Sequence, residues 1–182
     1  EFVQQQQALQ EQQQQVEILK GPSATIGGRG TTGGAVNIVT KQAADQDFTV
    51  LSTTLGTDAT KRGTVDYNKV ISKELSIRAN GMWQDANVAG RDEVFDNRWG
   101  GSFAVAWKPS DFFRITADYY HLSLDQLPDW GVPWDSVRHQ PFTDSGVNRT
   151  NYYGYPSRDF QKGTQDMVTA TAEGRLAPGV TL

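Results

Sequence analysis

From Asp47 onward, apolar and polar residues alternate along the chain in stretches of roughly ten residues that turn-forming residues separate. A period of two indicates β-strands with one apolar and one polar face. The pattern predicts six strands and the start of a seventh. Their ranges are 48–56, 63–71, 75–84, 98–108, 112–122, 163–176 and 180–182. The sequence therefore predicts an all-β fold from residue 47 to residue 182.

The fourth and fifth predicted strands show the alternation most clearly. In the fourth, five residues share one face: Trp99, Gly101, Phe103, Val105 and Trp107. In the fifth, the corresponding residues are Phe113, Ile115, Ala117 and Tyr119. At ~3.3 Å per residue and a tilt of ~45°, the two tryptophans lie roughly 20 Å apart along a membrane normal, near the height of the apolar band of an outer-membrane barrel. A soluble antiparallel sheet with one buried face is the alternative.

The predicted connections alternate in length. Three of them are three-residue turns, at 72–74, 109–111 and 177–179. The others have five, thirteen and forty residues, at 58–62, 85–97 and 123–162. Outer-membrane barrels have short periplasmic turns and longer external loops. If the chain enters the first of these strands from the periplasmic side, all three longer loops lie outside the cell.

A glycine-dense loop between two short strands precedes this region. Strands are predicted at 16–19 and 35–40, with a Gly21–Pro22 turn and five glycines among residues 27–34. The spacing Gly28, Gly30, Gly33 matches a dinucleotide fingerprint, which needs a helix after the glycines. The residues that follow are rich in β-branched types and predict a strand instead. We therefore interpret the glycines as a tight backbone turn.

This strand–loop–strand resembles the end of the plug domain of TonB-dependent outer-membrane receptors. The matching residues are the Lys20-Gly21-Pro22 turn, the Gly28-Arg29-Gly30 motif and the tail Gly33-Gly34-Ala35-Val36-Asn37-Ile38-Val39-Thr40-Lys41. The resemblance implies the C-terminal part of a plug at 16–46, followed at 47–182 by the first six to seven strands of a transmembrane antiparallel β-barrel. It also implies that Lys20 and Arg29 face acidic residues of the barrel wall. The alternative is that both are ordinary solvated charges.

Composition narrows the function classes. Hydrophobic residues make up 37% of the 182, and no apolar run approaches the ~20 residues of a membrane helix. The chain has no cysteine, hence no disulfide or thiolate metal site. The net charge is −4 without a basic block, which argues against nucleic-acid binding. Residues 1–15 form a glutamine-rich, low-complexity segment.

The predicted forty-residue loop carries the candidate ligand-binding residues. They are Trp130, Trp134, Arg138, Tyr152, Tyr153, Tyr155 and Arg158. Aromatic faces and guanidinium groups suit flat, anionic, aromatic ligands such as a ferric catecholate. The loop also resembles the third external loop of catecholate-type siderophore receptors. Its four Lys and Arg residues oppose five Asp, so overall charge does not explain such binding. Equally, these aromatic residues could fold the loop on itself.

No arrangement of residues suggests catalysis. His121 and His139 lack metal-ligand spacing, and we expect His121 to end the fifth predicted strand. The sequence thus predicts no enzyme, metal site or cofactor. The resemblance implies part of a bacterial outer-membrane receptor that imports a ferric siderophore, in contact with outer-membrane lipid. The TonB energy-transducing complex would act through a segment N-terminal to this one. Six strands and a stub cannot close such a barrel, so we expect a fragment. Alternatives are import of another chelate (cobalamin, haem or carbohydrate) and a soluble β-rich binding module.

Overall fold

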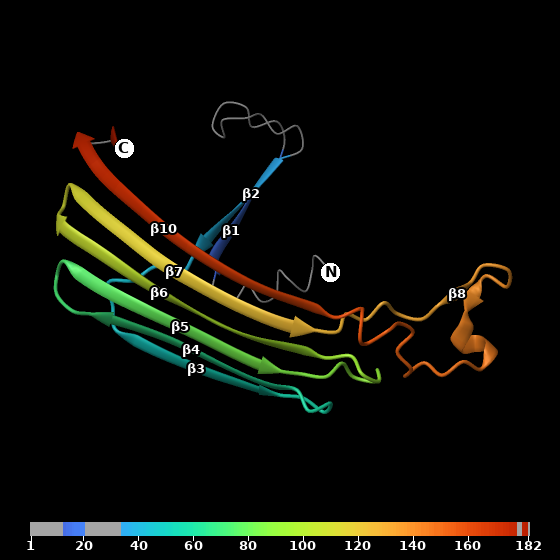
Figure 1. The fold of residues 1–182 in the computed structure, drawn as a ribbon. Coiled ribbons are helices and arrows are strands. Elements are labelled where there is room, and N and C mark those ends of the chain that lie inside the picture. Colours follow the sequence, from blue (N-terminus) through green and yellow to red (C-terminus); the bar gives the residue numbers. More distant parts are fainter. Residues whose placement is uncertain (1–12, 21–33, 178–179, 182) are drawn as a thin grey trace.

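The computed structural model describes residues 13–20, 34–177 and 180–181, with side chains described for 40–174. A two-stranded hairpin is followed by a seven-stranded, strongly curved sheet, and a smaller hairpin lies in the longest loop (Figure 1). The elements are β1 (Gln13–Lys20), β2 (Gly34–Thr40), β3 (Phe48–Leu55), β4 (Lys61–Val70), β5 (Leu75–Asp85), β6 (Asp96–Ser110), β7 (Phe113–Gln126), β8 (Trp134–Asp135), β9 (Gln140–Pro141), the 3₁₀ turn η1 (Phe142–Ser145), β10 (Gln161–Ala177) and β11 (Val180–Thr181).

The large sheet is an antiparallel meander in the order β11-β10-β7-β6-β5-β4-β3. From β3 to β7, each strand pairs with the next one along the chain. β10 pairs with β7 across the longest loop, without interruption from Gln161 to Gly174. The all-β prediction and the order of the strands are thus confirmed. This topology is that of consecutive strands in a barrel wall.

The two faces of the sheet have opposite character. One face exposes large apolar side chains that include Trp83, Trp99, Phe103, Trp107 and Tyr119. The other face buries polar side chains, among them Asn68, Ser76, Arg78 and Asn80. The predicted alternation of β6 and β7 is therefore confirmed, with the aromatic face outward. In a soluble protein the apolar face would be the buried one.

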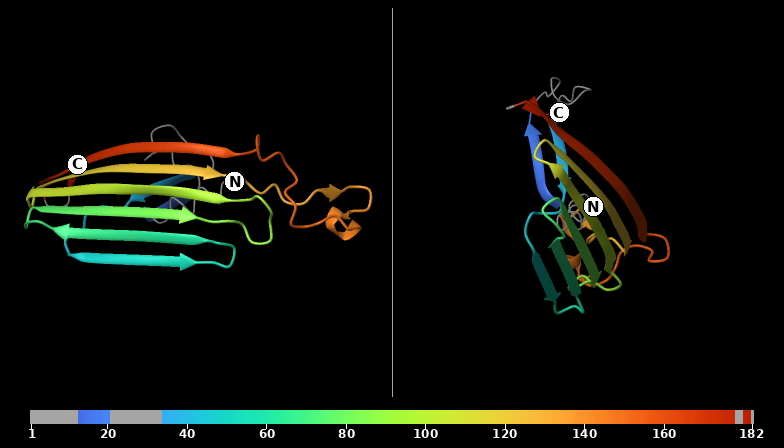
Figure 2. Two further views of the ribbon diagram at one scale, coloured as in Figure 1. Left: turned by 60° about the horizontal axis from the view of Figure 1, so that its bottom comes forward. Right: turned by 90° about the vertical axis from the view of Figure 1, so that its left-hand side faces the viewer.

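The polar face is buried because the preceding part of the chain lies against it. Figure 2 shows β1 and β2 on the concave side of the sheet, with the linker 41–47 leading from β2 into β3. Ala43 of this linker is only 2% exposed. Asp118 of β7 lies within hydrogen-bonding reach of Thr40, the last residue of β2, and of Thr169 in β10. The concave face is thus the inner face of the wall.

Several predicted boundaries were wrong by a few residues. The turn expected at 109–111 lies at 111–112, and Phe112 is in the turn instead of a strand. The pairing of β6 with β7 shifts between Trp107 and Ser110, which accommodates Pro109 and its missing N–H without ending the strand. The strands around the longest loop extend further than predicted, so that loop spans 127–160. Backbone pairing continues there through polar residues, as in the Gln126–Gln161 pair.

The glutamine-rich segment is not entirely without structure. Its last three residues, Gln13 to Gln15, belong to β1, where Gln15 pairs with Val39 and Gln13 with Thr40. Main-chain hydrogen bonds form this ladder, so side-chain composition does not prevent it. Residues 1–12 lie outside the described part of the chain.

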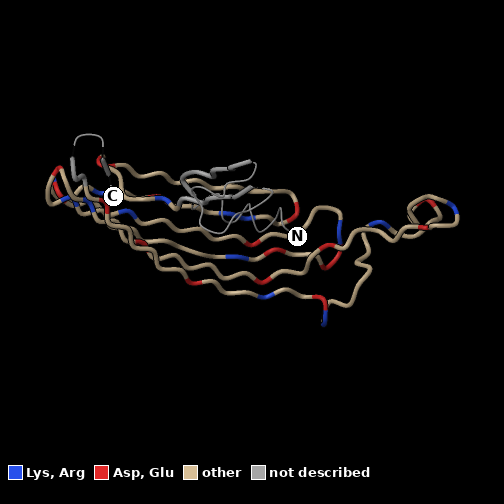
Figure 3. Tube along the Cα trace, turned by 90° about the horizontal axis from the view of Figure 1, so that it is seen from above, with Lys and Arg blue, Asp and Glu red and all other residues tan. Residues whose placement is uncertain are grey.

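All three longer loops lie at one end of the sheet, and the short turns 71–74 and 111–112 lie at the other. The loops 56–60, 86–95 and 127–160 share the end where β8 lies in Figure 1. Charged residues crowd at the opposite end, at the left of Figure 3, where Lys73, Glu74 and Asp111 occupy the turns. The predicted phase of the connections is therefore confirmed. Among the described residues, no helix is both long and apolar enough to cross a bilayer.

Candidate functional site

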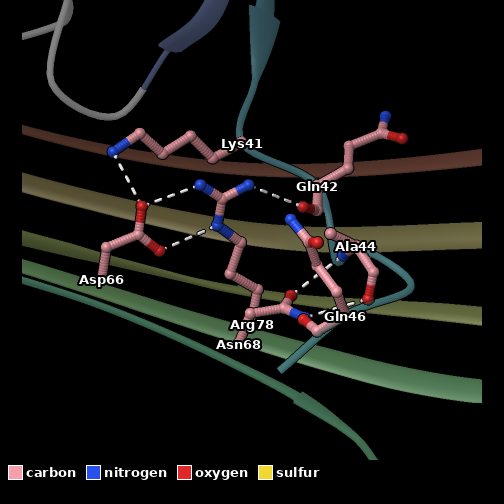
Figure 4. A network of polar contacts seen from close by, with 7 residues as sticks. All are labelled: Lys41, Gln42, Ala44, Gln46, Asp66, Asn68 and Arg78. Carbon is pink, nitrogen blue, oxygen red and sulfur yellow. Dashed lines mark hydrogen bonds and ion pairs between the residues drawn. The ribbon is translucent and has the colours of Figure 1, made fainter. Parts of the chain in front are cut away.

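The linker between β2 and β3 is fastened to the inner face of the sheet by side chains of β4 and β5 (Figure 4). Asn68 is 1% exposed, and its amide accepts from the Ala44 N–H at 2.9 Å. The same amide donates to the carbonyl oxygens of Ala44 at 2.9 Å and Gln46 at 2.6 Å. A buried amide is stable only when its donors and acceptor are satisfied, and here the linker backbone satisfies them.

A charged group lies beside this amide. Arg78 donates from Nε and Nη2 to the two carboxylate oxygens of Asp66, at 2.8 and 2.7 Å, and from Nη1 to the Gln42 carbonyl at 2.9 Å. Lys41 Nζ lies 3.1 Å from the same carboxylate (Figure 4). The Arg78 side chain is 11% exposed and that of Asp66 14%. A bidentate, mostly buried pair of this kind fixes the geometry of the linker as well as its position.

The predicted plug–barrel contacts at Lys20 and Arg29 cannot be placed. Arg29 and the side chain of Lys20 lie outside the described residues. The contacts that the structure does describe come from Lys41, Asp66, Asn68 and Arg78, which sequence reasoning did not select. The sequence did contain a signal for this contact: Asp66 and Arg78 lie on the polar faces of adjacent predicted strands. Charged residues that face inward need partners of opposite charge.

The longest loop contains two separate groups of the predicted ligand-binding residues. The first is the hairpin β8–η1, which carries Trp134 and Arg138. Trp134 is 60% exposed, and Arg138 Nη1 lies 3.4 Å from Ser145 Oγ and 3.8 Å from an Asp135 oxygen. This hairpin extends beyond the end of the sheet (Figure 1). Across the described residues, no hydrogen bond, ion pair or ring contact joins it to the second group.

The second group surrounds Asp159 and brings together Tyr152, Tyr155 and Arg158. The Tyr155 N–H donates to Asp159 Oδ2 at 2.7 Å, and Arg158 Nε donates to Oδ1 at 2.9 Å. The Arg158 guanidinium lies 4.7 Å from the centre of the Tyr155 ring, a cation–π geometry. The Tyr155 N–H and the Arg158 side chain together hold the pKa of the Asp159 carboxyl below its ordinary value.

Tyr152 connects this group to Trp130. Burial raises the pKa of the Tyr152 phenol and Asp159 adds to the shift, while the nearby Trp130 indole opposes it. Trp130 itself is 60% exposed. Tyr153 is turned differently, because its hydroxyl donates to the Asn148 carbonyl. Around Asp159, the most exposed aromatic side chains are therefore Trp130 and Tyr155, whereas Tyr152 is half-buried.

Arg91 in the loop 86–95 is a further residue that sequence reasoning missed. Its guanidinium donates to Asp129 and to the carbonyls of Gly131 and Arg149, all in the longest loop. The sequence around it, Gly90-Arg91-Asp92-Glu93, predicts only a solvated charged loop. The two loops therefore form one structure at the end of the sheet.

His121 does not end its strand as predicted. It lies inside β7 on the outer face, because the strand continues through polar residues to Gln126. His121 Nδ1 lies 2.8 Å from Asp166 Oδ1, which also accepts from the Tyr119 hydroxyl at 2.6 Å. In the described part of the chain, no group of three or more His, Cys, Asp or Glu residues could hold a metal ion.

The fold and the junction define a class of protein. A curved antiparallel wall with an aromatic outer face has a polar inner face that binds the strand segment before it. Such an arrangement is typical of the first strands of a transmembrane β-barrel that carries a plug inside.

Comparisons with known proteins agree with this class. The probable TonB-dependent receptor BfrD of Bordetella pertussis is 35% identical over 168 residues, which is 91% of this chain and 23% of BfrD. The catecholate siderophore receptor Fiu of Escherichia coli K12 is 30% identical over 178 residues, 93% of this chain and 23% of Fiu. No protein-family model matches the chain.

Solved structures give the same result. The crystal structure of the ferric-catecholate import receptor Fiu, in its open form, has a TM-score of 0.80 at 31% identity and covers 93% of this chain and 27% of Fiu. The siderophore receptor PiuA of Acinetobacter baumannii also has a TM-score of 0.80, at 32% identity, covering 93% of this chain and 24% of PiuA. Over most of its own length the chain is thus similar to TonB-dependent siderophore receptors, and it spans about a quarter of their length.

Proposed function

We propose that this chain is part of a TonB-dependent receptor of the bacterial outer membrane that binds a ferric siderophore outside the cell and imports it. Residues 16–46 are the end of the plug, and residues 47–182 are barrel wall in contact with outer-membrane lipid. Energy comes from the TonB complex through a part of the whole receptor that precedes these residues. The observation that carries the proposal is the linker bound to a polar inner wall whose outer face is aromatic.

The proposed ligand surface lies on the longest external loop. Trp130, Trp134 and Tyr155 expose aromatic faces, each at least 60% accessible. Catecholate rings of a ferric chelate can stack on such faces. The guanidinium groups of Arg138 and Arg158 supply positive charge for the anionic complex, and their side chains are 66% and 72% exposed. Tyr152 and Tyr153 complete the set by shaping the loop around these residues.

The plug and the wall must stay connected while the plug rearranges. The Asn68 amide and the Asp66–Arg78 pair hold the linker 41–47 to β4 and β5. We therefore place the moving part of the plug before Lys41. Lys20 and Arg29 remain the proposed contacts between that part and acidic residues of the wall.

Titration of the whole receptor in detergent with a panel of chelates tests the proposal. The panel contains ferric tris-catecholate, a ferric hydroxamate, haem and cyanocobalamin, and binding is followed by quenching of tryptophan fluorescence. We expect saturable binding of the ferric catecholate. Replacing Trp130, Tyr155 or Arg158 by alanine should weaken it about 2- to 30-fold each, since one stacking or cation–π contact contributes about 0.5–2 kcal/mol. Trp83→Ala, on the outer face, is the control and should leave affinity unchanged.

If the receptor prefers haem or cobalamin, its ligand is another chelate and not a siderophore, and the proposed architecture still holds. Binding of none of the four, by a receptor that is folded and inserted in membrane, would contradict the proposed function.

A further inference from the structure

Arg91 of the loop 86–95 forms hydrogen bonds with two separate segments of the longest loop. Arg91 Nη2 donates to Asp129 Oδ1 at 2.8 Å and to the Gly131 carbonyl at 2.9 Å. Arg91 Nη1 donates to the Arg149 carbonyl, eighteen residues further along the loop than Gly131. One planar guanidinium therefore joins two segments of the longest loop that are distant in sequence.

The Arg91 side chain is buried, whereas its acceptors Asp129 and Arg149 lie at the surface. The Arg91 side chain is 7% exposed, although the loops around it are on the surface. The planar guanidinium spreads five donors over a rigid fork that can reach acceptors on two backbone segments, whereas the lysine ammonium presents three donors from a single point. Backbone and hydroxyl contacts reinforce the same seam: the Asp92 N–H donates to the Thr150 carbonyl at 2.6 Å, and Thr150 Oγ1 donates to Asp92 at 2.9 Å.

The apolar base of the two loops supports this seam. Val94 and Leu127 are each 2% exposed, and the Leu127 N–H donates to the Phe95 carbonyl at 3.0 Å. The base fixes where the loops leave the wall. Farther out, Arg91 contacts both segments, and Asp92 contacts the second one.

The two segments held by Arg91 lead directly to the proposed ligand surface. Asp129 and Gly131 are the neighbours of Trp130 on either side, and Gly131 has a φ of +80°, which favours glycine at this bend. Arg149 and Thr150 precede Tyr152, whose phenol lies near the Trp130 indole. The bridge thus sets the position of Trp130 relative to Tyr152.

We propose that Arg91 is a positioning residue for siderophore binding: it acts through Trp130 and Tyr152 and does not itself contact the ligand. This inference rests on the proposed function for its ligand, and on the geometry of the loops for its mechanism. If loss of the bridge lowers the fraction of binding-competent loop to about one tenth, apparent affinity falls about tenfold.

The test uses the whole receptor with Arg91→Ala, Arg91→Lys and the control Arg149→Ala. The control removes an identical charge from the same seam but keeps the Arg149 carbonyl that accepts from Arg91. Two readouts are made on each protein: hydrogen–deuterium exchange of residues 128–133 and 148–153, and affinity for ferric tris-catecholate.

We expect Arg91→Ala to raise exchange in both segments and to weaken binding about tenfold, without change in the exchange of β5 to β7. Arg91→Lys should fail to restore either readout, and Arg149→Ala should match the wild type. Unchanged exchange in Arg91→Ala would overturn the proposal. So would full rescue by lysine, since a single charge would then suffice.

A double mutant separates positioning from general disruption. If Arg91 acts through Trp130, Arg91→Ala should cost much less affinity in a Trp130→Ala background than in the wild type. Equal costs in both backgrounds would overturn that mechanism. If the wild-type receptor binds none of the four chelates, the proposed function fails, whereas the exchange measurement still decides whether Arg91 orders the two segments.

Discussion

The two faces of the seven-stranded sheet are built from the same strands but differ in the polarity and burial of their side chains. The outer face carries large aromatic side chains that stay exposed, such as Trp99 and Phe103. The inner face carries amides and charges that are buried, such as Asn68 and Arg78. In the proposed receptor, lipid surrounds the apolar face, whereas the linker 41–47 binds to the polar face. Each face can be disrupted without touching the other.

The largest effect is expected on the inner face, from Asp66→Leu. The substitution leaves Arg78 and Lys41 without their carboxylate, and breaking a buried pair on one side costs about 3–5 kcal/mol. The free energy of unfolding of the whole receptor, from denaturant titration in lipid, checks this. The control Lys69→Ala breaks the exposed Lys69–Asp47 pair and should cost no more than about 1 kcal/mol. Similar losses in both variants would mean that the linker junction is not specially stabilised.

A smaller, depth-dependent effect is expected on the outer face. Phe103 lies between the tryptophan levels of β6, so Phe103→Arg should destabilise the receptor by about 2–4 kcal/mol. Trp107→Arg, at the turn end of the same strand, should cost about 0–1 kcal/mol. The matching alanine variants of both residues correct for the lost aromatic rings. A cost at Trp107 as large as that at Phe103 would argue against a bilayer around this face.

The smallest effect is expected from a change of pH on the stability of the longest loop around Asp159. The pKa of Asp159 is lowered in the folded loop, so its contribution is fully present above the ordinary carboxyl pKa of about 3.9 and is lost as pH falls through the lowered value. Backbone protection of residues 152–160 against hydrogen exchange should therefore decline below about pH 4. Asp159→Asn should show weaker protection at pH 6 and little change with pH. Equal pH dependence in both proteins would assign it to another group.

The sequence was sufficient to predict the wall because alternation is a local property. Trp99, Phe103 and Trp107 share a face whatever lies beyond the strand, and the connection lengths set the phase of the loops. Strand ends were less predictable. Pairing at Gln126 and the irregularity at Pro109 depend on the neighbouring strand, which a single strand's composition does not report.

The contacts between segments distant in sequence could not be predicted from the sequence alone. Arg91 meets Asp129 and Arg149 only because the topology brings two loops to one end of the sheet. Asn68 is likewise an ordinary polar residue of a strand until the linker crosses it. The candidate aromatic residues of the long loop were identifiable by composition, but their division into a hairpin group and an Asp159 group was not.

We propose that the aromatic face of this sheet lies in lipid. Spin labels placed one at a time at positions 99 to 107 of the whole receptor, reconstituted in bilayers, test it most directly. We expect accessibility to dissolved oxygen to alternate with a period of two and to be high at 99, 101, 103, 105 and 107, and accessibility to a polar nickel chelate to be low at 103. Labels at 103 that are immobilised and shielded from oxygen would show that this face packs against protein, and would contradict the account.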